Sequence, residues 1–209
     1  MDRSSLLLYA ITDSQCIGER DFYEAVRQAI MGGATVIQLR EKGLTGAELT
    51  EKAKKLKAVC QEYNVPLIVN DNVQAAIDSG ADGVHVGADD MDVAGIRKLA
   101  GEGFIIGATA KTPEQAQKAQ QQGADYLGCG ALFASPTKTN ARPMTIATLK
   151  AITSSVDIPV VAIGGLTLDN IDIIKDSGVS GAAVISAVFA EKDIQSAAAA
   201  LKAKLGYLV

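Results

Sequence analysis

The sequence predicts an α/β protein, a single (β/α)8 TIM barrel that occupies residues 1–209. Three observations predict it. Eight apolar runs of strand length alternate with amphipathic stretches of helix length. The runs are apolar throughout, as in a parallel sheet that is covered by helices. No linker or low-complexity stretch interrupts the alternation, and eight strand–helix units close most readily into a barrel.

The apolar runs mark the expected strands. In chain order they are LLLYAIT (6–12), TVIQLR (35–40), PLIVN (66–70), GVHVG (83–87), FIIGAT (104–109), YLGCG (126–130), PVVAIGG (159–165) and GAAVIS (181–186). Glycine and a small residue come just before every second strand, as in GGATVIQ and SGADGVHV, whereas proline opens the third and seventh. A doubled βαβα period therefore lies inside the single one.

The stretches between the strands predict the helices, because their apolar residues are three and four apart and most of them end at glycine. Clear examples are FYEAVRQAIMGG (22–33), ELTEKAKKLKAVCQEY (48–63), TPEQAQKAQQQG (112–123) and LDNIDIIKDSG (168–178). The alternative fold is an open doubly wound sheet with a dinucleotide crevice. It would carry GxGxxG after the first strand, and YAITDSQCIGERD lacks that pattern.

The composition restricts the function classes. The formal net charge is −4 with no basic stripe, so we expect no nucleic-acid partner. The apolar segment at 6–11 is too short to span a membrane. Cys16, Cys60 and Cys129 have no metal-type spacing and fit a reducing cytoplasm. The single histidine, His85, excludes a two-histidine zinc site, and within its strand we expect a hydrogen-bonded core residue.

Polar residues follow the carboxyl ends of several strands, where barrels of this kind carry their catalytic groups. The second strand ends in Gln38, Arg40 and Lys42, the third in Asn70 and Asp71, the fourth in Asp89 and Asp90, the fifth in Thr109, and the sixth in Ser135, Thr137 and Lys138. Because Gln38, Arg40 and Lys42 alternate along the chain, we expect them to point into the barrel lumen. An ordinary solvated strand end is the other interpretation.

Two of these residues suggest a metal. Asp71 and Asp90 end neighbouring strands, and a pair of carboxylates with ligand oxygens nearby suits Mg²⁺. Each could instead cap a helix, because NDNVQAAI and ADDMDVAGI both look like helix starts. A divalent metal beside several cations indicates a highly anionic ligand, of which a diphosphate is the simplest.

A second anion site is expected after the last two strands. AIGGL, with Gly165, and VISA, with Ile185 and Ser186, offer backbone N–H groups that can approach an anion closely. The loops after strands seven and eight are the usual phosphate site of these barrels. The chain is thus expected to bind two phosphorylated ligands.

Over nearly its whole length the sequence resembles the thiamine-phosphate synthase family. The matching stretches are, in order, YAITD, GGATVIQLREK, LIVNDNV, GADGVHVGADDM, IIGATAKTPEQA, GADYLGCG, SPTK, IPVVAIGGL and AAVISAV. The resemblance implies a TIM-barrel transferase that joins hydroxymethylpyrimidine diphosphate to a thiazole phosphate with Mg²⁺, giving thiamine monophosphate and pyrophosphate. It also implies small-molecule substrates and no nucleic-acid or membrane partner. Self-association is left open, and a dimer would be no surprise.

The resemblance assigns roles to the motif residues. Gln38 would face the pyrimidine, while Arg40, Lys42, Asn70 and the Thr109 hydroxyl would hold the diphosphate. The metal ligands would be Asp71 and Asp90. Ser135 and Thr137 would contact the thiazole phosphate and Lys138 the leaving group, with Gly165, Ile185 and Ser186 completing the phosphate cradle.

The chain departs from the family pattern at Lys111, Ala88 and Ala131, where histidine, glutamine and proline are frequent. Three alternatives follow. A related subfamily tautomerises the thiazole and would need an acid or base near Lys111. A sugar-phosphate epimerase would need two metal-binding histidines. A noncatalytic phosphate-binding barrel would have no reason to keep two crowded carboxylates.

Overall fold

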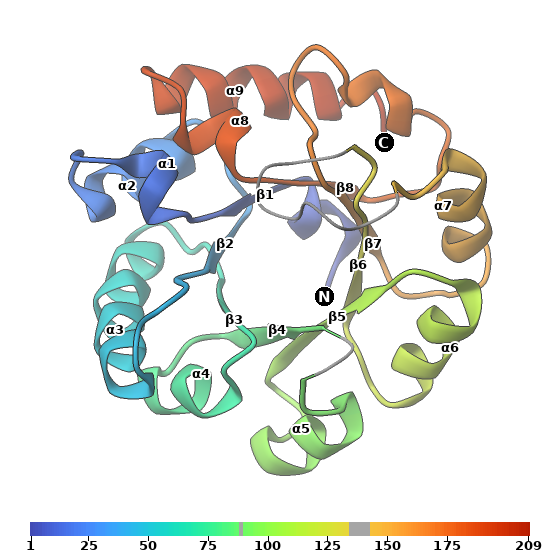
Figure 1. Cartoon of the computed structure of the whole chain (residues 1–209), viewed down its shortest axis with the longest axis horizontal. Helices are drawn as coiled ribbons and strands as arrows, with labels where there is room; N and C mark the ends of the chain where they lie inside the picture. The colour runs from blue at the N-terminus through green and yellow to red at the C-terminus, as the bar shows by residue number, and fades with distance from the viewer. Residues whose placement is uncertain (88–89, 134–142) are drawn as a thin grey trace.

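The computed structural model describes residues 1–87, 90–133 and 143–209. The eight predicted strands form one closed parallel barrel in chain order, with β8 paired to β1 (Figure 1). The strands are β1 Leu8–Ile11, β2 Val36–Leu39, β3 Leu67–Asn70, β4 Gly83–Val86, β5 Ile105–Ala110, β6 Tyr126–Gly130, β7 Val160–Ile163 and β8 Gly181–Val184. The barrel prediction is therefore confirmed, and the open doubly wound sheet is wrong.

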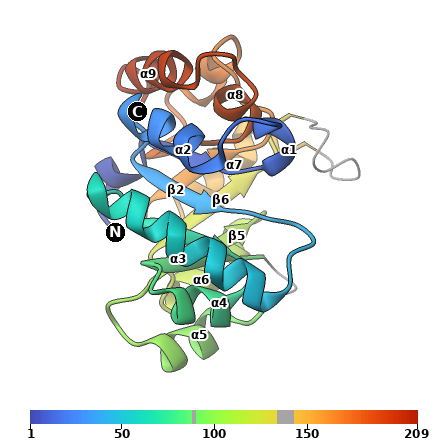
Figure 2. The same ribbon diagram turned by 90° about the vertical axis from the view of Figure 1, so that its left-hand side faces the viewer.

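Helices surround the strands as an outer layer (Figures 1 and 2). They are α1 Ser14–Ile17, α2 Phe22–Met31, α3 Gly46–Glu62, α4 Val73–Ser79, α5 Val93–Ala100, α6 Pro113–Gln121, α7 Ile146–Thr153, α8 Ser186–Phe189 and α9 Ile194–Leu205, with 3-10 turns η1 Arg3–Leu6 and η2 Ile171–Ile174. Within the described ranges, none of these helices combines the length and apolar character needed to cross a membrane.

Local sequence explains where several helices begin. Thr45 and Glu48 form a reciprocal capping box at the start of α3. Thr112 caps α6 and Pro113 fills its first position, where a missing N–H costs nothing. These signals lie in the segments where the apolar spacing also predicts helices.

The helix expected over 168–178 is wrong, since this segment contains only the short turn η2. Asn170 hydrogen-bonds locally instead of capping a helix: its side chain accepts from Thr167 N at 2.8 Å and donates to Gly165 O at 2.9 Å. Asp176, at φ 56°, then takes the left-handed conformation and ends the helical path. Ile171 and Ile174 still bury their side chains, which accounts for the apolar spacing.

The buried side chains form two cores. The larger core lies between the strands and the helices, as the two-sided apolar strands require. The smaller core fills the barrel lumen, with Tyr9, Val36, Ile68, Tyr126 and Val161 among its members. The lumen is therefore a packed interior, and side chains on its open end have a rigid base beneath them.

The structure also explains the doubled period in the sequence. A residue just before an even-numbered strand hydrogen-bonds an amide near the start of the preceding odd-numbered strand. The contacts are Thr35 Oγ1 with Leu8 N (3.1 Å), Asp82 Oδ2 with Leu67 N (2.7 Å) and Asp125 Oδ2 with Ile106 N (2.8 Å). These side chains satisfy amides that the strand ladder leaves unpaired at this end of the barrel.

Candidate active site

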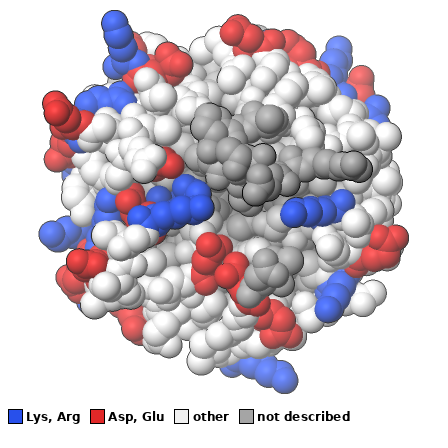
Figure 3. Space-filling view, viewed as in Figure 1, with Lys and Arg blue, Asp and Glu red and all other residues white. Residues whose placement is uncertain are grey.

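The carboxyl ends of the strands meet at one mouth of the barrel, the end that Figure 1 faces. Lumen-facing positions on adjacent strands are held together by register: Gln38 pairs with Ile11 and Ile68, and Asn70 pairs with His85. On this face, Lys and Arg side chains reach toward the centre from two sides, with Asp and Glu side chains beside them (Figure 3).

Below the mouth, a chain of hydrogen bonds crosses the lumen. Gln38 Nε2 donates to Tyr9 Oη at 2.9 Å, and the hydroxyls of Tyr9 and Tyr126 lie 2.7 Å apart. His85 follows, with Nδ1 at 3.1 Å from Tyr126 Oη and Nε2 at 3.1 Å from Thr109 Oγ1. Two predicted substrate contacts, Gln38 and Thr109, are thus held at the ends of one chain.

The two tyrosine hydroxyls at the centre of this series of hydrogen bonds are uncharged. Burial raises the pKa of both Tyr9 and Tyr126, so both remain neutral hydroxyls. Gln38 is 3% exposed and lies on the lumen side, as predicted. The hydrogen bonds of His85 fit the interpretation that it is a bonded residue of the barrel interior.

Arg40 lies just beyond β2 and is fixed by the end of β1. Its amide donates to Thr12 Oγ1 at 3.1 Å, and its guanidinium is 3.3 Å from Asp13 Oδ2. The Arg40 and Asp13 side chains are 13% and 12% exposed, so little water screens this pair. The cation is therefore held in place before any ligand arrives.

The expectation that Gln38, Arg40 and Lys42 share one strand face is wrong for Lys42. β2 ends at Leu39, and the chain turns at Gly43, which has φ 100°. Lys42 is exposed in that turn, so strand alternation does not set its direction.

Asp71 and Asp90 come together at the ends of β3 and β4. Asp71 has a left-handed backbone, with φ 62°, and its amide donates to His85 O at 2.8 Å. Asp90 Oδ2 accepts from Gly87 N at 2.7 Å. Burial raises the pKa of Asp71, and the charge of Asp90 and a hydrogen bond with it raise this pKa further, so the two carboxyls are close neighbours.

The alternative that these two aspartates cap helices is wrong. Asn72 caps α4 by accepting from Ala75 N at 2.9 Å, and Asp92 caps α5 by accepting from Gly95 N at 3.1 Å. Asp71 and Asp90 are therefore not needed for helix capping.

Two crowded carboxylates are a donor set that fits Mg²⁺, which takes few protein oxygens and keeps ligand or water oxygens in its other positions. Burial and, after it, the neighbouring Asp90 charge raise the pKa of Asp71, and a divalent cation would relieve the repulsion between the two carboxylates. Among the described residues, no group of three or more His, Cys, Asp or Glu side chains is arranged to hold a metal.

The predicted phosphate cradle lies after β7 and β8. Gly165, with φ 65°, follows β7, and Ile185 and Ser186 begin α8 at the end of β8. Gly164, with φ 105°, lets the chain pass close to the loop after β6, because a Cβ there would lie 2.4 Å from the Ala131 Cβ. The helical hydrogen bonds of α8 begin with the Val188 and Phe189 amides, which donate to Ile185 O at 3.2 and 2.9 Å.

Ser135, Thr137 and Lys138, predicted for the same mouth, lie outside the described residues, as do Ala88 and Asp89. Lys111, at the family's frequent histidine position, is exposed. Asp13 is a site residue that was not predicted from the sequence, although its position after the first strand parallels that of Asp71 after the third.

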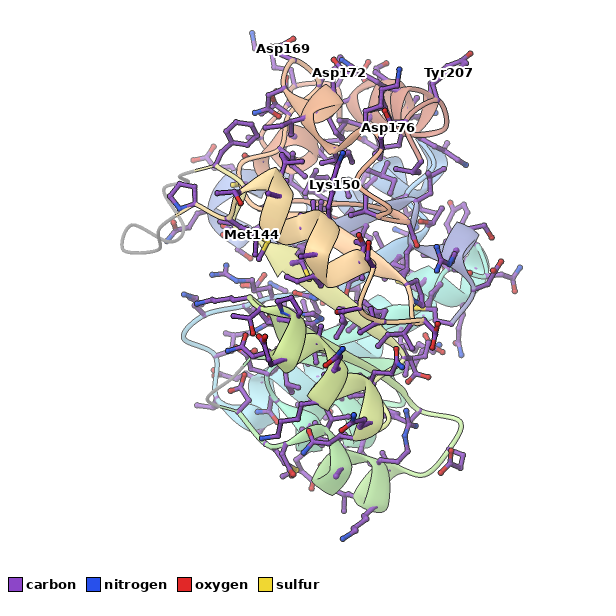
Figure 4. All side chains as sticks on the ribbon, turned by 90° about the vertical axis from the view of Figure 1, so that its right-hand side faces the viewer. Met144, Lys150, Asp169, Asp172, Asp176 and Tyr207 are labelled. Atoms are coloured by element: carbon purple, nitrogen blue, oxygen red, sulfur yellow. The ribbon has the colours of Figure 1, made fainter. Side chains whose placement is uncertain are left out.

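Two shallow pockets lie at the other end of the barrel. Their lining includes Leu7, Thr35 and Pro66, which come just before β1, β2 and β3, and Lys202 of α9 borders both. Tyr207, 88% exposed, lines the first pocket and projects from the end away from Met144 (Figure 4).

Comparison with known proteins shows the family of the chain. The family model described as thiamine monophosphate synthase matches residues 8–188. The chain belongs to the thiamine monophosphate synthase family. The thiamine-phosphate synthase of Alkaliphilus oremlandii is 44% identical over 198 residues, 95% of each chain, and that of Ruminiclostridium cellulolyticum is 46% identical over 91% of each.

Solved structures agree with the family. A thiamine phosphate pyrophosphorylase from Pyrococcus furiosus superposes with a TM-score of 0.90 at 39% identity, covering 99% of this chain and 98% of that one. A 3-hexulose-6-phosphate synthase has a TM-score of 0.68 at 16% identity over 95% and 99% of the two chains, and shares only the fold.

Proposed function

We propose that this chain catalyses the synthesis of thiamine monophosphate, as its curated relatives are named for doing. It would join hydroxymethylpyrimidine diphosphate to a thiazole phosphate and release pyrophosphate. The observation that carries the proposal is the meeting of Arg40 with the Asp71 and Asp90 carboxyls at the mouth that also holds the start of α8. The thiazole tautomerase and the noncatalytic barrel are not favoured.

The diphosphate would lie between the ends of β2 and β5. Arg40 and Lys42 would bind its oxygens by charge, and Asn70 and the Thr109 hydroxyl by hydrogen bonds. Gln38, fixed by Tyr9, would present its amide to the pyrimidine. Mg²⁺, held by Asp71 and Asp90, would supply positive charge to the diphosphate oxygens.

The thiazole phosphate would occupy the second anion site. Gly165, Ile185 and Ser186 would surround it with backbone amides, assisted by Ser135 and Thr137. Lys138 would complete the cationic surround of the leaving group. Two sites at one mouth bring the thiazole nitrogen to the carbon that carries the diphosphate.

The chemistry follows from stabilising the leaving group. The bond between that carbon and the diphosphate oxygen can break first, because the electron-rich aminopyrimidine delocalises the cation left behind. Arg40, Lys42 and Lys138 stabilise the charge that grows on the departing pyrophosphate. The thiazole nitrogen then donates its electron pair to the carbon and forms the new C–N bond. No side-chain nucleophile is required.

We also place the enzyme in the cytoplasm, since Cys16, Cys60 and Cys129 are free thiols. Its partners would be the two small-molecule substrates.

The test is to mix the purified protein with both substrates and Mg²⁺, and to measure pyrophosphate and thiamine phosphate together. We expect both products in equal amounts and only when both substrates are present. Chelation of the metal should abolish turnover, and added Mg²⁺ should restore it. Aromatisation of a thiazole tautomer without C–N bond formation would overturn the proposal.

A further inference from the structure

The guanidinium of Arg20 joins two short helices through their main-chain carbonyls. Its Nε donates to Ile17 O at 2.8 Å and its Nη2 to Cys16 O at 2.8 Å, both in the last turn of α1. Its Nη1 donates to Glu191 O at 2.6 Å, and Nη2 also donates to Phe189 O, at the end of α8. One side chain thus holds the carboxyl ends of two helices.

Arginine is chemically suited to this position. The last carbonyls of a helix lack intrahelical partners and carry a partial negative charge, so a cation there is favourable. The planar guanidinium presents five N–H donors in fixed directions, whereas a lysine amine cannot reach several separate carbonyls in this way. Helices of four residues are not stable alone, so α1 and α8 depend on tertiary contacts, which for α8 are the buried side chains of Val188 and Phe189 together with the Arg20 hydrogen bonds.

The other end of α1 is fixed to the predicted diphosphate site. Asp13 accepts from Gln15 N at 2.9 Å as the helix cap and also pairs with Arg40. Ser14 donates to Glu41 Oε1 at 2.7 Å. α1 is therefore anchored to the chain at 40–41 by contacts that do not involve Arg20.

The other end of α8 is the predicted phosphate cradle, because Ile185 and Ser186 begin that helix. α1 and α8 lie side by side at the mouth of the barrel (Figures 1 and 2). Within the described contacts, Arg20 thus links an anchored helix, α1, to the helix that carries the cradle.

We propose that Arg20 is a positioning residue that holds α8, and with it the cradle at Ile185 and Ser186, at a fixed distance from Arg40. The inference rests on the proposed function for its choice of ligands. Arg20 acts through α8, since its guanidinium faces main-chain carbonyls. Its loss should release α8 and leave the Arg40 side of the mouth in place.

The experiment compares Arg20→Met and Arg20→Lys with the wild-type enzyme. Arg20→Met keeps the aliphatic stem without the donors, and Arg20→Lys keeps the charge without the fork. Arg27→Met is the matched control, because Arg27 contacts only Glu24 and Glu62 among the ion pairs of the described chain. The KM of each substrate is measured with the other at saturation, and hydrogen exchange is followed in residues 185–191.

We expect Arg20→Met to raise the KM of the thiazole phosphate about tenfold, the loss of about 1.4 kcal/mol of binding. The KM of the pyrimidine diphosphate should change by less than about twofold, because the Arg40 side of the mouth stays in place. Exchange at 185–191 should be faster, Arg20→Lys should resemble Arg20→Met, and Arg27→Met should match the wild type.

An equal rise in both KM values, full rescue by lysine, or unchanged exchange at 185–191 would overturn the inference. If Arg20→Met does not fold, Arg20→Lys gives the same comparison. Failure of the wild-type enzyme to release pyrophosphate would overturn the proposed function instead. The exchange measurement would then still decide whether Arg20 holds α8.

Discussion

Asp71 and Asp90 place their carboxyls close together at the mouth of the barrel, and the repulsion between them lowers the stability of the folded protein. Arg40, already paired with Asp13, offsets only part of it: burial and the Asp90 charge raise the pKa of Asp71 despite the opposite effect of Arg40. A binding site for a divalent cation is the arrangement in which such crowding is useful.

The first prediction concerns turnover. Asp71→Asn removes a predicted Mg²⁺ ligand with little change in shape, so we expect kcat to fall by about 10²- to 10³-fold and the Mg²⁺ concentration for half-saturation to rise. Steady-state assays over a Mg²⁺ series measure both. Asp78→Asn, on the exposed surface of α4, makes the same charge change and should leave activity unaltered. An active Asp71→Asn enzyme with wild-type Mg²⁺ dependence would contradict the metal assignment.

The second prediction concerns stability and pH. The folded-state pKa of Asp71 lies above its ordinary value of 3.8, so the protonated carboxyl is favoured by folding. Its stability contribution is present below that ordinary value and is lost as pH rises through the raised pKa. At neutral pH without metal, Asp71→Asn should therefore raise the Tm, and the gain should vanish near pH 3.

Thermal unfolding in chelator at several pH values measures this, with Asp78→Asn as the control. Added Mg²⁺ should stabilise the wild-type protein and have less effect on Asp71→Asn. A lower Tm for Asp71→Asn at neutral pH would contradict the prediction, because the ionised carboxylate would then stabilise the folded protein.

At the residue scale, the sequence predicted groups whose positions follow from strand ends. Gln38, Asn70, Asp71 and Thr109 all lie within one residue of the carboxyl end of a strand, and topology alone brings strand ends together. Asp13 was missed because its importance comes from a side-chain contact with Arg40 across two strands, which spacing along the chain does not encode.

At the scale of elements, the residues before the even strands act as caps for their neighbours. Asp125 is the strongest case, since it accepts from Ile106 N and also pairs with Arg97 at 2.7 Å. Ser180 occupies the equivalent place before β8, yet its buried Oγ has no hydrogen-bond partner in the part of the chain that the structure describes.

The third prediction uses this contrast. Asp125→Ala leaves the buried Ile106 amide unpaired and removes the carboxylate partner of Arg97, so the free energy of unfolding should fall by about 2–3 kcal/mol. Ser180→Ala removes a buried hydroxyl that gains nothing by being there, and should be neutral or slightly stabilising. Denaturant titrations measure both. Equal losses in the two variants would refute the capping role.

Element type was predictable where the apolar spacing and the caps agreed, as in α3 and α6. The segment 168–178 shows the limit: two buried isoleucines three apart fit a helix, but side-chain hydrogen bonds of Asn170 and the left-handed Asp176 decide otherwise. α1 and α8 were not predicted, because four residues are too few to show a period.

For the whole molecule, closure of β8 onto β1 joins the first and the last strand of the chain in one sheet. We therefore predict that residues 1–209 unfold as a single domain. Far-UV circular dichroism and the fluorescence of the five tyrosines, which include Tyr9 and Tyr126 in the lumen, should give coincident denaturation curves. Two separate transitions would contradict the prediction.

The filled lumen of the barrel determines how substrates enter and products leave. The buried side chains of Tyr9, Ile68, Tyr126 and Val161 fill the barrel along its axis and block passage between its two ends. Both substrates therefore enter, and both products leave, through the same open end of the barrel. Pyrophosphate that stays bound there would block the next two substrates and the release of thiamine monophosphate.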